Sequence, residues 1–309
     1  MNMGTLIYNL FMIFLMIFVG IFAGKTKMVN SKAQGDFTAF LMNIAVPCLV
    51  FSSMIREYNS SLIRDTVIIF LLGLLFFGGA LVLNQWTVAW FKVSPGRRNV
   101  WTVSVSLSNT GFVGFPLVRA VFGEEGLFLA AMMNLAYNCV CWSYGAKVMT
   151  KGTDQAASTD WKKILLSNIN LAVFLGFPCF LLRLSPPAPV MTVIRDFGNI
   201  TTPLSMFLIG LNLSQGKLRE VFTDRDVYTI TLMRLVGMPL LILLILRLLP
   251  LPGDSILKGV ALIITAMPCP SAGMMLAQRY GQDADLASRA IFLSSLCCIV
   301  TIPLIMLLL

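Results

Sequence analysis

The stretch NIAVPCLVF at residues 43–51 has a counterpart, NITTPLSMF, at residues 199–207. Both read N-I-x-x-P-x-x-x-F. A second pair follows downstream, FGEEG at residues 122–126 and YGQDA at residues 280–284. In both pairs the two members are separated by nearly the same distance, close to half of the 309 residues. This pattern predicts a duplicated structural unit of about 155 residues.

The composition places this duplicated unit in a membrane. Hydrophobic residues make up 57% of the chain and charged residues 12%, whereas soluble domains carry about 25% charged residues. The mean hydropathy is +0.84. A helix that crosses the ~30 Å hydrocarbon layer needs roughly 20 apolar residues. Ten such spans are predicted, at residues 4–24, 37–55, 66–91, 100–118, 127–146, 164–183, 197–213, 227–248, 256–276 and 289–309.

Ten spans in two copies give five helices per repeat, and an odd number of helices inverts the second copy. The sequence therefore predicts an all-α integral membrane protein of ten transmembrane helices. Residues 1–149 form the first five-helix repeat and residues 162–309 the second, inverted one. The polar segment 150–161 has no apolar periodicity and is predicted to be the linker between them. Inverted repeats are typical of secondary transporters, which bind substrate at the repeat interface.

The positive charges predict the orientation in the membrane. Fifteen of the 23 lysines and arginines fall in loops on the same side of the membrane as the linker. Seven fall on the other side and Arg234 lies within the eighth span. Because positive residues favour the cytoplasmic side, the linker is predicted to be cytoplasmic and both termini outside a plasma membrane. The formal net charge of +9 is thus a topology signal, and no nucleic-acid partner is predicted.

Two of the ten spans contain helix-breaking residues at corresponding places. The fourth contains SLSNTGFVGFP at residues 106–116, and the ninth contains TAMPCPSAG at residues 265–273. Proline removes a backbone N–H and glycine loosens a helix. The freed backbone groups persist at membrane depth only in a protein-lined or wet cavity, and the positive ends of half-helices favour an anion. Broken helices 4 and 9 are predicted at Gly114, Pro116, Pro268 and Pro270.

Polar side chains near these breaks are the candidate ligands. Asn109 and Asn138 each offer two donors and an acceptor, and burying an amide without partners is costly. The alternative for both is a hydrogen bond that only holds helices together. Asn43 either contacts substrate or caps the break before Pro47. The predicted substrate-binding set is Asn109, Thr110, Gly111, Asn138, Pro268, Cys269, Pro270, Ser271 and Asn43.

Several classes of site are disfavoured. No Asp or Glu falls well inside a span and the chain has no His, so coupling through a buried carboxylate is not expected. Arg234 is expected to snorkel to the interface rather than to bind substrate. The seven cysteines lie within apolar spans, and no disulfide framework, metal site or cofactor is predicted. Soluble-enzyme motifs are absent, so no catalytic residue is predicted.

These motifs resemble those of the auxin efflux carrier family, within the bile-acid/arsenite/riboflavin transporter-like superfamily. The resemblance covers all ten spans. It rests on SNTG at 108–111, GFPL at 114–117, NCVCW at 138–142, AMP at 266–268 and AQRYG at 277–281.

The resemblance implies a crossover of helices 4 and 9, with Asn109 as the substrate-contacting Asn and Asn138 in the place of the family's Gln. It implies a scaffold of helices 1, 2, 6 and 7 that forms a homodimer, and a transport domain of helices 3–5 and 8–10 that moves like an elevator. The chain lacks the long central loop of the plant exporters, and Ser143 stands where they have Tyr. A small carboxylate such as malate or malonate therefore fits better than auxin.

The leading hypothesis is a secondary transporter, an efflux carrier of small organic anions such as mono- and dicarboxylates. The alternative is a sodium-coupled organic anion symporter of the bile-acid type. In that case Asn and Ser oxygens and the carbonyls freed at the breaks would ligate Na⁺. A membrane receptor would need a signalling domain, and a membrane enzyme would need a nucleophile–base pair or a metal cluster.

Overall fold

The computed structural model describes residues 3–152, 159–215, 221, 223–249 and 255–306, and in these residues it is helical with no strand. Residues 153–158 of the predicted linker lie outside the described residues. The prediction of an all-α protein is confirmed.

Each of the ten predicted spans overlaps helix. The helices of the first half are α1 (Met3–Lys25), α2 (Ser31–Phe40), α3 (Val46–Met54), α4 (Ser60–Trp90), α5 (Arg98–Ser106), α6 (Phe115–Val140) and α7 (Ala146–Met149). Those of the second half are α8 (Trp161–Leu165), α9 (Asn168–Leu181), α10 (Ala188–Asn199), α11 (Thr201–Gln215), α13 (Arg225–Leu232), α14 (Met238–Leu248), α15 (Ser255–Ala266), α16 (Ser271–Arg279) and α17 (Ala284–Met306). Three π-helical turns join consecutive helices: Leu41–Ala45 joins α2 to α3, Cys141–Gly145 joins α6 to α7, and Met233–Gly237 joins α13 to α14. A fourth, Thr110–Gly114, leads directly into α6.

Several of these helices can cross a membrane by length and composition. Among the described residues, four qualify: Lys32–Met54, Ser60–Trp90, Arg225–Leu248 and Ala284–Ile305. The pair Ile256–Ala266 and Ser271–Arg279 is bent by 46° at its break and gives a fifth candidate if it is one span. The inverted order of two five-helix repeats stays a prediction.

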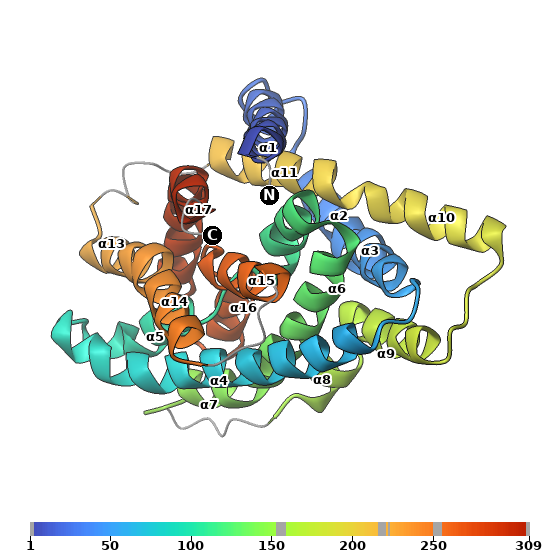
Figure 1. Ribbon diagram of the computed structural model, residues 1–309. Helices are drawn as coiled ribbons and strands as arrows, with labels where there is room; N and C mark the ends of the chain where they lie inside the picture. The colour runs from blue at the N-terminus through green and yellow to red at the C-terminus, as the bar shows by residue number, and fades with distance from the viewer. Residues whose placement is uncertain (1–2, 153–158, 216–220, 222, 250–254, 307–309) are drawn as a thin grey trace.

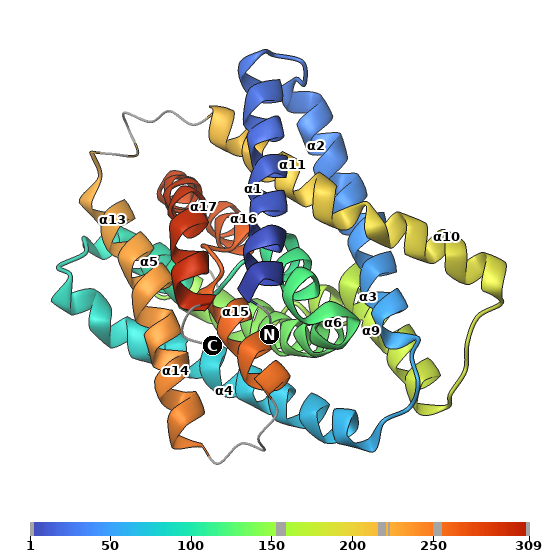
Figure 2. The ribbon, with the colours of Figure 1, turned by 45° about the horizontal axis from the view of Figure 1, so that its top comes forward.

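The helices pack in two groups. In one, α1 lies along α11, and α3 packs against α9 and α10, on the top and right of Figure 1. In the other, α4 packs against α5 and α6, α15 against α6 and α14, and α17 against α13 and α16. Figure 2 shows α1 and α11 crossing in front of the second group. The division into a scaffold and a transport domain stays a prediction, because helices of the two groups also contact each other, α3 with α6 and α11 with α17.

The α1–α11 contact is a backbone contact. A Cβ added at Gly20 would lie 2.1 Å from the carbonyl oxygen of Phe207, and one at Gly210 would lie 2.1 Å from that of Ile17. Small residues allow membrane helices to approach this closely. The two glycines therefore determine how near α1 and α11 lie.

The two repeated pairs differ in how closely their backbones match. Asn43 lies in a π-helical turn that continues into the helix of Pro47, whereas Asn199 ends α10 ahead of Pro203. Gly123 and Gly281 have positive φ values of 64° and 62°, a conformation that favours glycine. Gly123 makes a sharp kink within α6, which divides the fourth predicted span from the fifth.

Several helices begin earlier than predicted, and the seventh span differs most. The seventh span was predicted from residue 197, but α10 already begins at Ala188. Pro187 precedes α10 as its N-cap, and Pro189 lies in the first turn of the helix. A proline is favourable there because its missing N–H would have no intrahelical partner. The polar residues Arg195 and Asp196 interrupt the apolar run, so hydropathy alone places the start of the helix too late.

Candidate functional site

The two interrupted spans meet at their breaks. The helix α5 ends at Ser106, and the chain becomes helical again in the turn Thr110–Gly114 that leads into α6. In the ninth span, α15 ends at Ala266 and α16 begins at Ser271. The backbone N–H of Asn109 donates to the carbonyl of Pro268 at 2.9 Å. The sequence predicted a break in each span, and the family resemblance implied that the two spans cross there; this hydrogen bond joins the two interruptions.

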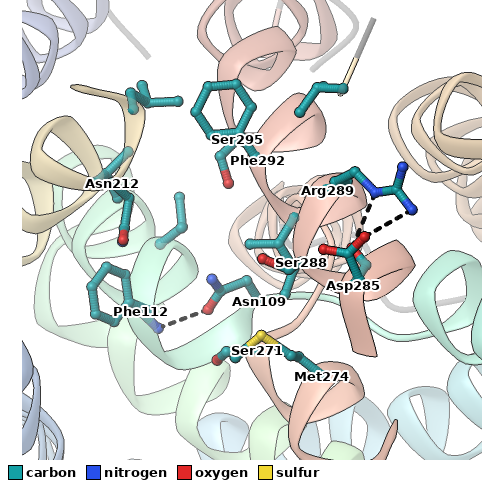
Figure 3. Close-up of a pocket in the computed structure, with 15 residues that line it drawn as sticks. Asn109, Phe112, Asn212, Ser271, Met274, Asp285, Ser288, Arg289, Phe292 and Ser295 are labelled. Atoms are coloured by element: carbon teal, nitrogen blue, oxygen red, sulfur yellow. Dashed lines mark hydrogen bonds and ion pairs between the residues drawn. The ribbon is translucent and has the colours of Figure 1, made fainter. Parts of the chain in front are cut away.

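A cavity of about 440 Å³ lies beside this crossing. Its walls come from Asn109 and the turn that follows it, from α11, and from the starts of α16 and α17 (Figure 3). The polar residues of the lining are Asn109, Asn212, Ser271, Asp285, Ser288, Arg289 and Ser295. Apolar residues, among them Phe112, Met274 and Phe292, complete it. The lining thus combines polar groups with an apolar wall.

Asn109 has both a structural and an exposed side. Its Oδ1 accepts a hydrogen bond from the backbone N–H of Phe112 at 3.3 Å and so caps the turn that follows. Its Nδ2 group forms no hydrogen bond within the described residues and points into the cavity (Figure 3). An amide nitrogen in this position can donate to a ligand oxygen.

The start of α16 faces the same cavity. Pro270 is the N-cap residue and provides no side-chain cap, and Ser271 lines the cavity. The first N–H groups of a helix have no intrahelical partner and carry partial positive charge. Asn109 and the start of α16 therefore bring hydrogen-bond donors to one place from two distant segments.

The charged end of the cavity was missed by sequence reasoning. Arg289 pairs with Asp285 at 3.0 Å and with Asp224 at 3.2 Å. Asp224 in turn pairs with Arg97 at 2.9 Å, and Figure 3 shows Arg289 turned toward Asp285. The spacing of Asp285 and Arg289 on one helix face was a signal of their pairing. Nothing local to those residues indicated that they would line the same cavity as Asn109.

The other predicted residues of the two breaks lie behind the cavity. Thr110 donates from its hydroxyl to Asn134 Oδ1 at 2.5 Å, and the N–H of Cys269 donates to Ser294 Oγ at 3.0 Å. Gly111, Pro268 and Pro270 are buried. These residues build the crossing, and only Asn109 and Ser271 of the predicted set line the cavity.

Two predicted amides lie elsewhere. Asn138 is 8% exposed, and its Nδ2 donates to Asn170 Oδ1 at 2.9 Å. Asn43 is exposed, and its Oδ1 accepts from Asn168 Nδ2 at 3.0 Å. Both amides join helices in this structure, and neither lines the cavity.

The expectation that Arg234 snorkels to the interface is wrong. Arg234 is 0% exposed. Its guanidinium donates to the carbonyl of Val105 at 2.8 Å, to that of Met267 at 3.0 Å, and also to those of Leu107 and Thr265. The broken helices supply acceptors at membrane depth, and the cation therefore does not need to reach water.

Comparison with known proteins finds one matching family and several similar transporters. A sequence model of a family described as membrane transport protein matches residues 5–306. An uncharacterized transporter of Methanothermobacter thermautotrophicus is 25% identical, over 94% of this chain and 94% of its own length. A candidate malonate transporter of Rhizobium meliloti is 23% identical, over 93% of this chain and 90% of its own. An uncharacterized transporter of Escherichia coli (strain K12) is 21% identical, over 96% and 95%.

Proposed function

The chain belongs to the membrane transport protein family, and on this premise we propose that it is a secondary transporter of small organic anions. This membership confirms the family resemblance found in the sequence. The observation that carries the choice of substrate is the cavity at the crossing, where Asn109 and Ser271 lie together. Mono- and dicarboxylates are the proposed substrates.

The cavity suits a carboxylate for three reasons. The free Nδ2 group of Asn109, the hydroxyl of Ser271 and the first N–H groups of α16 are donors that an anion accepts from. The positive end of the α16 dipole favours negative charge. Phe112 and Phe292 can contact a short carbon chain. The volume of about 440 Å³ is within the usual range for small-molecule sites, roughly 300–1,000 Å³.

A dicarboxylate would have a second partner in the cavity. Arg289 lines the end away from Asn109 and pairs there with the exposed carboxylate of Asp285. A second substrate carboxylate can take the place of Asp285 on the guanidinium, since Arg binds carboxylates in a bidentate manner. The name of the Rhizobium meliloti relative, a candidate malonate transporter, makes malonate the first compound to test.

An elevator-type mechanism is part of the proposal. The cavity lies between α11 and the starts of α16 and α17, near the loops that the charge pattern assigns to the cytoplasm. At the opposite end two contacts join the helix groups: Arg56 with Glu125 at 3.0 Å and Arg119 with Asn199 at 2.9 Å. This arrangement supports an inward-facing state. Movement of the second group against the first would break these two contacts.

The homodimer through the scaffold helices and the plasma-membrane location with both termini outside belong to the same proposal. The positive-inside pattern supports the orientation, and the α1–α11 contact supports a rigid scaffold.

Transport by the purified protein in liposomes tests the proposal. Radiolabelled malonate, malate and a monocarboxylate are loaded inside, and a membrane potential or a sodium gradient is imposed. We expect efflux to follow the potential, because 100 mV contributes about 2.3 kcal/mol per charge, or roughly a 50-fold gradient. Efflux should ignore a modest sodium gradient.

Two outcomes would change the proposal. Accumulation driven by sodium at zero potential would replace the uncoupled carrier by the sodium-coupled symporter. Absence of transport for every carboxylate, with folded protein in the liposomes, would reject the substrate class.

A further inference from the structure

Arg234 lies where the first halves of both broken spans end. It belongs to the π-helical turn Met233–Gly237, and its hydrogen bonds reach two carbonyls of the fourth span and two of the ninth. The distances are 2.8 Å to Val105, 3.2 Å to Leu107 and 3.0 Å to Met267, and Thr265 is the fourth acceptor. Within the described residues, Arg234 has no carboxylate partner among the ion pairs.

The four acceptors are all backbone carbonyls at the C-terminal ends of interrupted helices. The helix α5 ends at Ser106 with Leu107 extended after it, and α15 ends at Ala266. The last carbonyls of a helix have no intrahelical partner, and together they form the negative end of its dipole. Two such ends converge on one buried point, and the guanidinium is the positive charge at that point.

Carbonyls at the ends of broken helices are also the groups that coordinate sodium in other transporters. A sodium ion at this point would need the lone pairs that Arg234 already uses. It would also lie next to a buried positive charge, which repels it strongly in a medium of low dielectric constant. The arginine and a sodium ion therefore exclude each other.

We propose that Arg234 is a built-in cation that fills a latent sodium site at the crossing and so removes sodium coupling from this transporter. The effect on sodium coupling rests on the proposed transport function. The site itself is a property of the folded chain and is testable without transport. It deepens the proposed function by assigning one residue that determines the choice of coupling ion.

Substitution of Arg234 should uncover the site. Arg234→Met removes the charge and leaves carbonyl oxygens without partners at membrane depth, which is costly. A small cation can then satisfy them. Arg234→Lys keeps the charge and three donors and serves as the matched control. Arg234→Gln, which is neutral but donates two N–H bonds, is a second neutral variant.

The measurement is the thermal unfolding temperature of the purified full-length protein in sodium chloride and in choline chloride of equal concentration. For wild type, the unfolding temperature should be the same in sodium chloride as in choline chloride. The same should hold for Arg234→Lys. Arg234→Met should unfold several degrees lower in choline chloride and recover part of the loss in sodium chloride, with a saturable dependence on sodium. Millimolar guanidinium ion should also restore stability to this variant, because it replaces the missing group.

A sodium-dependent rise in the unfolding temperature of wild type would overturn the proposal, and this arm holds even if neither neutral variant folds. Folded neutral variants that respond neither to sodium nor to guanidinium would overturn it as well. Failure of the transport function is separate, since it would appear as folded wild type that moves no carboxylate while the salt dependence of the variants is as expected.

Discussion

At the scale of single residues, two amides that look alike in the sequence have different surroundings. Asn109 directs its Nδ2 group into the cavity. Asn138 instead bonds the buried Asn170, whose own Nδ2 donates to the carbonyl of Ile164. Truncation of an exposed donor costs a ligand contact that water can replace. Truncation of a buried donor leaves its acceptor unpaired, and the two amides should therefore respond differently to mutation.

We expect Asn109→Ala to reduce carboxylate transport at least about tenfold, the equivalent of one lost hydrogen bond of about 1.4 kcal/mol. It should also lose about 1 kcal/mol of stability, because the cap of the turn Thr110–Gly114 is removed. Asn138→Ala is the matched variant. It should lose roughly 1–3 kcal/mol of stability, because it leaves Asn170 Oδ1 unpaired. Liposome transport and thermal unfolding of both variants check this. Equal losses of stability and activity for Asn109→Ala would indicate a structural amide instead.

At the scale of helices, close packing and helix breaks have separate roles. The α1–α11 pair is held at backbone contact by Gly20 and Gly210. The fourth and ninth spans are interrupted instead, and their free ends are satisfied by Asn109, Ser294 and Arg234. Both features lie at membrane depth, where water is not available to satisfy backbone groups.

Gly210→Ala should lower the unfolding temperature by several degrees. The new Cβ would lie 2.1 Å from the carbonyl oxygen of Ile17, so α1 has to move away and its packing is lost. Gly79→Ala in α4 is the control, since a Cβ there has nothing within 4 Å. It should be neutral or stabilising by up to about 1 kcal/mol, because alanine favours helix. If both variants unfold at the same temperature, the close α1–α11 contact has no stabilising role.

At the scale of the whole molecule, the ion pairs divide as the loop charges do. Arg97 pairs with Asp224, Asp226 and Asp283, and Arg279 pairs with Asp160. Arg97 lies between the third and fourth predicted spans and Arg279 between the ninth and tenth, in loops that the predicted topology places in the cytoplasm. Arg56 and Arg119 lie after the second and fourth spans, in loops predicted to be outside, and pair with Glu125 and Glu124. No ion pair among the described residues joins the two sets, as expected if a membrane separates them.

Cysteine labelling tests this division in whole cells, in a background without the seven native cysteines. A membrane-impermeant reagent should label Glu57→Cys, in an exposed loop predicted to be outside, and should fail to label Ser158→Cys in the linker. After permeabilisation both should react. Ready labelling of Ser158→Cys in intact cells would contradict the inverted-repeat topology.

Local properties of the sequence were sufficient to predict the all-α class and the approximate positions of the helices. Hydropathy over roughly 20 residues predicted ten spans, and each of them overlaps helix in the described residues, because burial in lipid depends on each segment's own composition. Pro268 and Pro270 located the break of the ninth span, since proline acts on its own backbone. In the fourth span the interruption lies at residues 107–109, and Gly114 and Pro116, where the break was predicted, lie in the helix that follows it. The start of α10 was misplaced because a helix that carries Arg195 and Asp196 is less apolar than the rest of its span.

Only the tertiary structure decided which polar groups meet. The cavity joins Asn109 with Asp285 and Arg289, which are distant in sequence, and it excludes Asn138 although both amides were predicted to bind substrate. Arg234 was misjudged for the same reason. Its acceptors are backbone carbonyls of residues 105, 107, 265 and 267, and every residue has such a carbonyl. Their availability depends on where two helices end in space, which composition and periodicity do not encode.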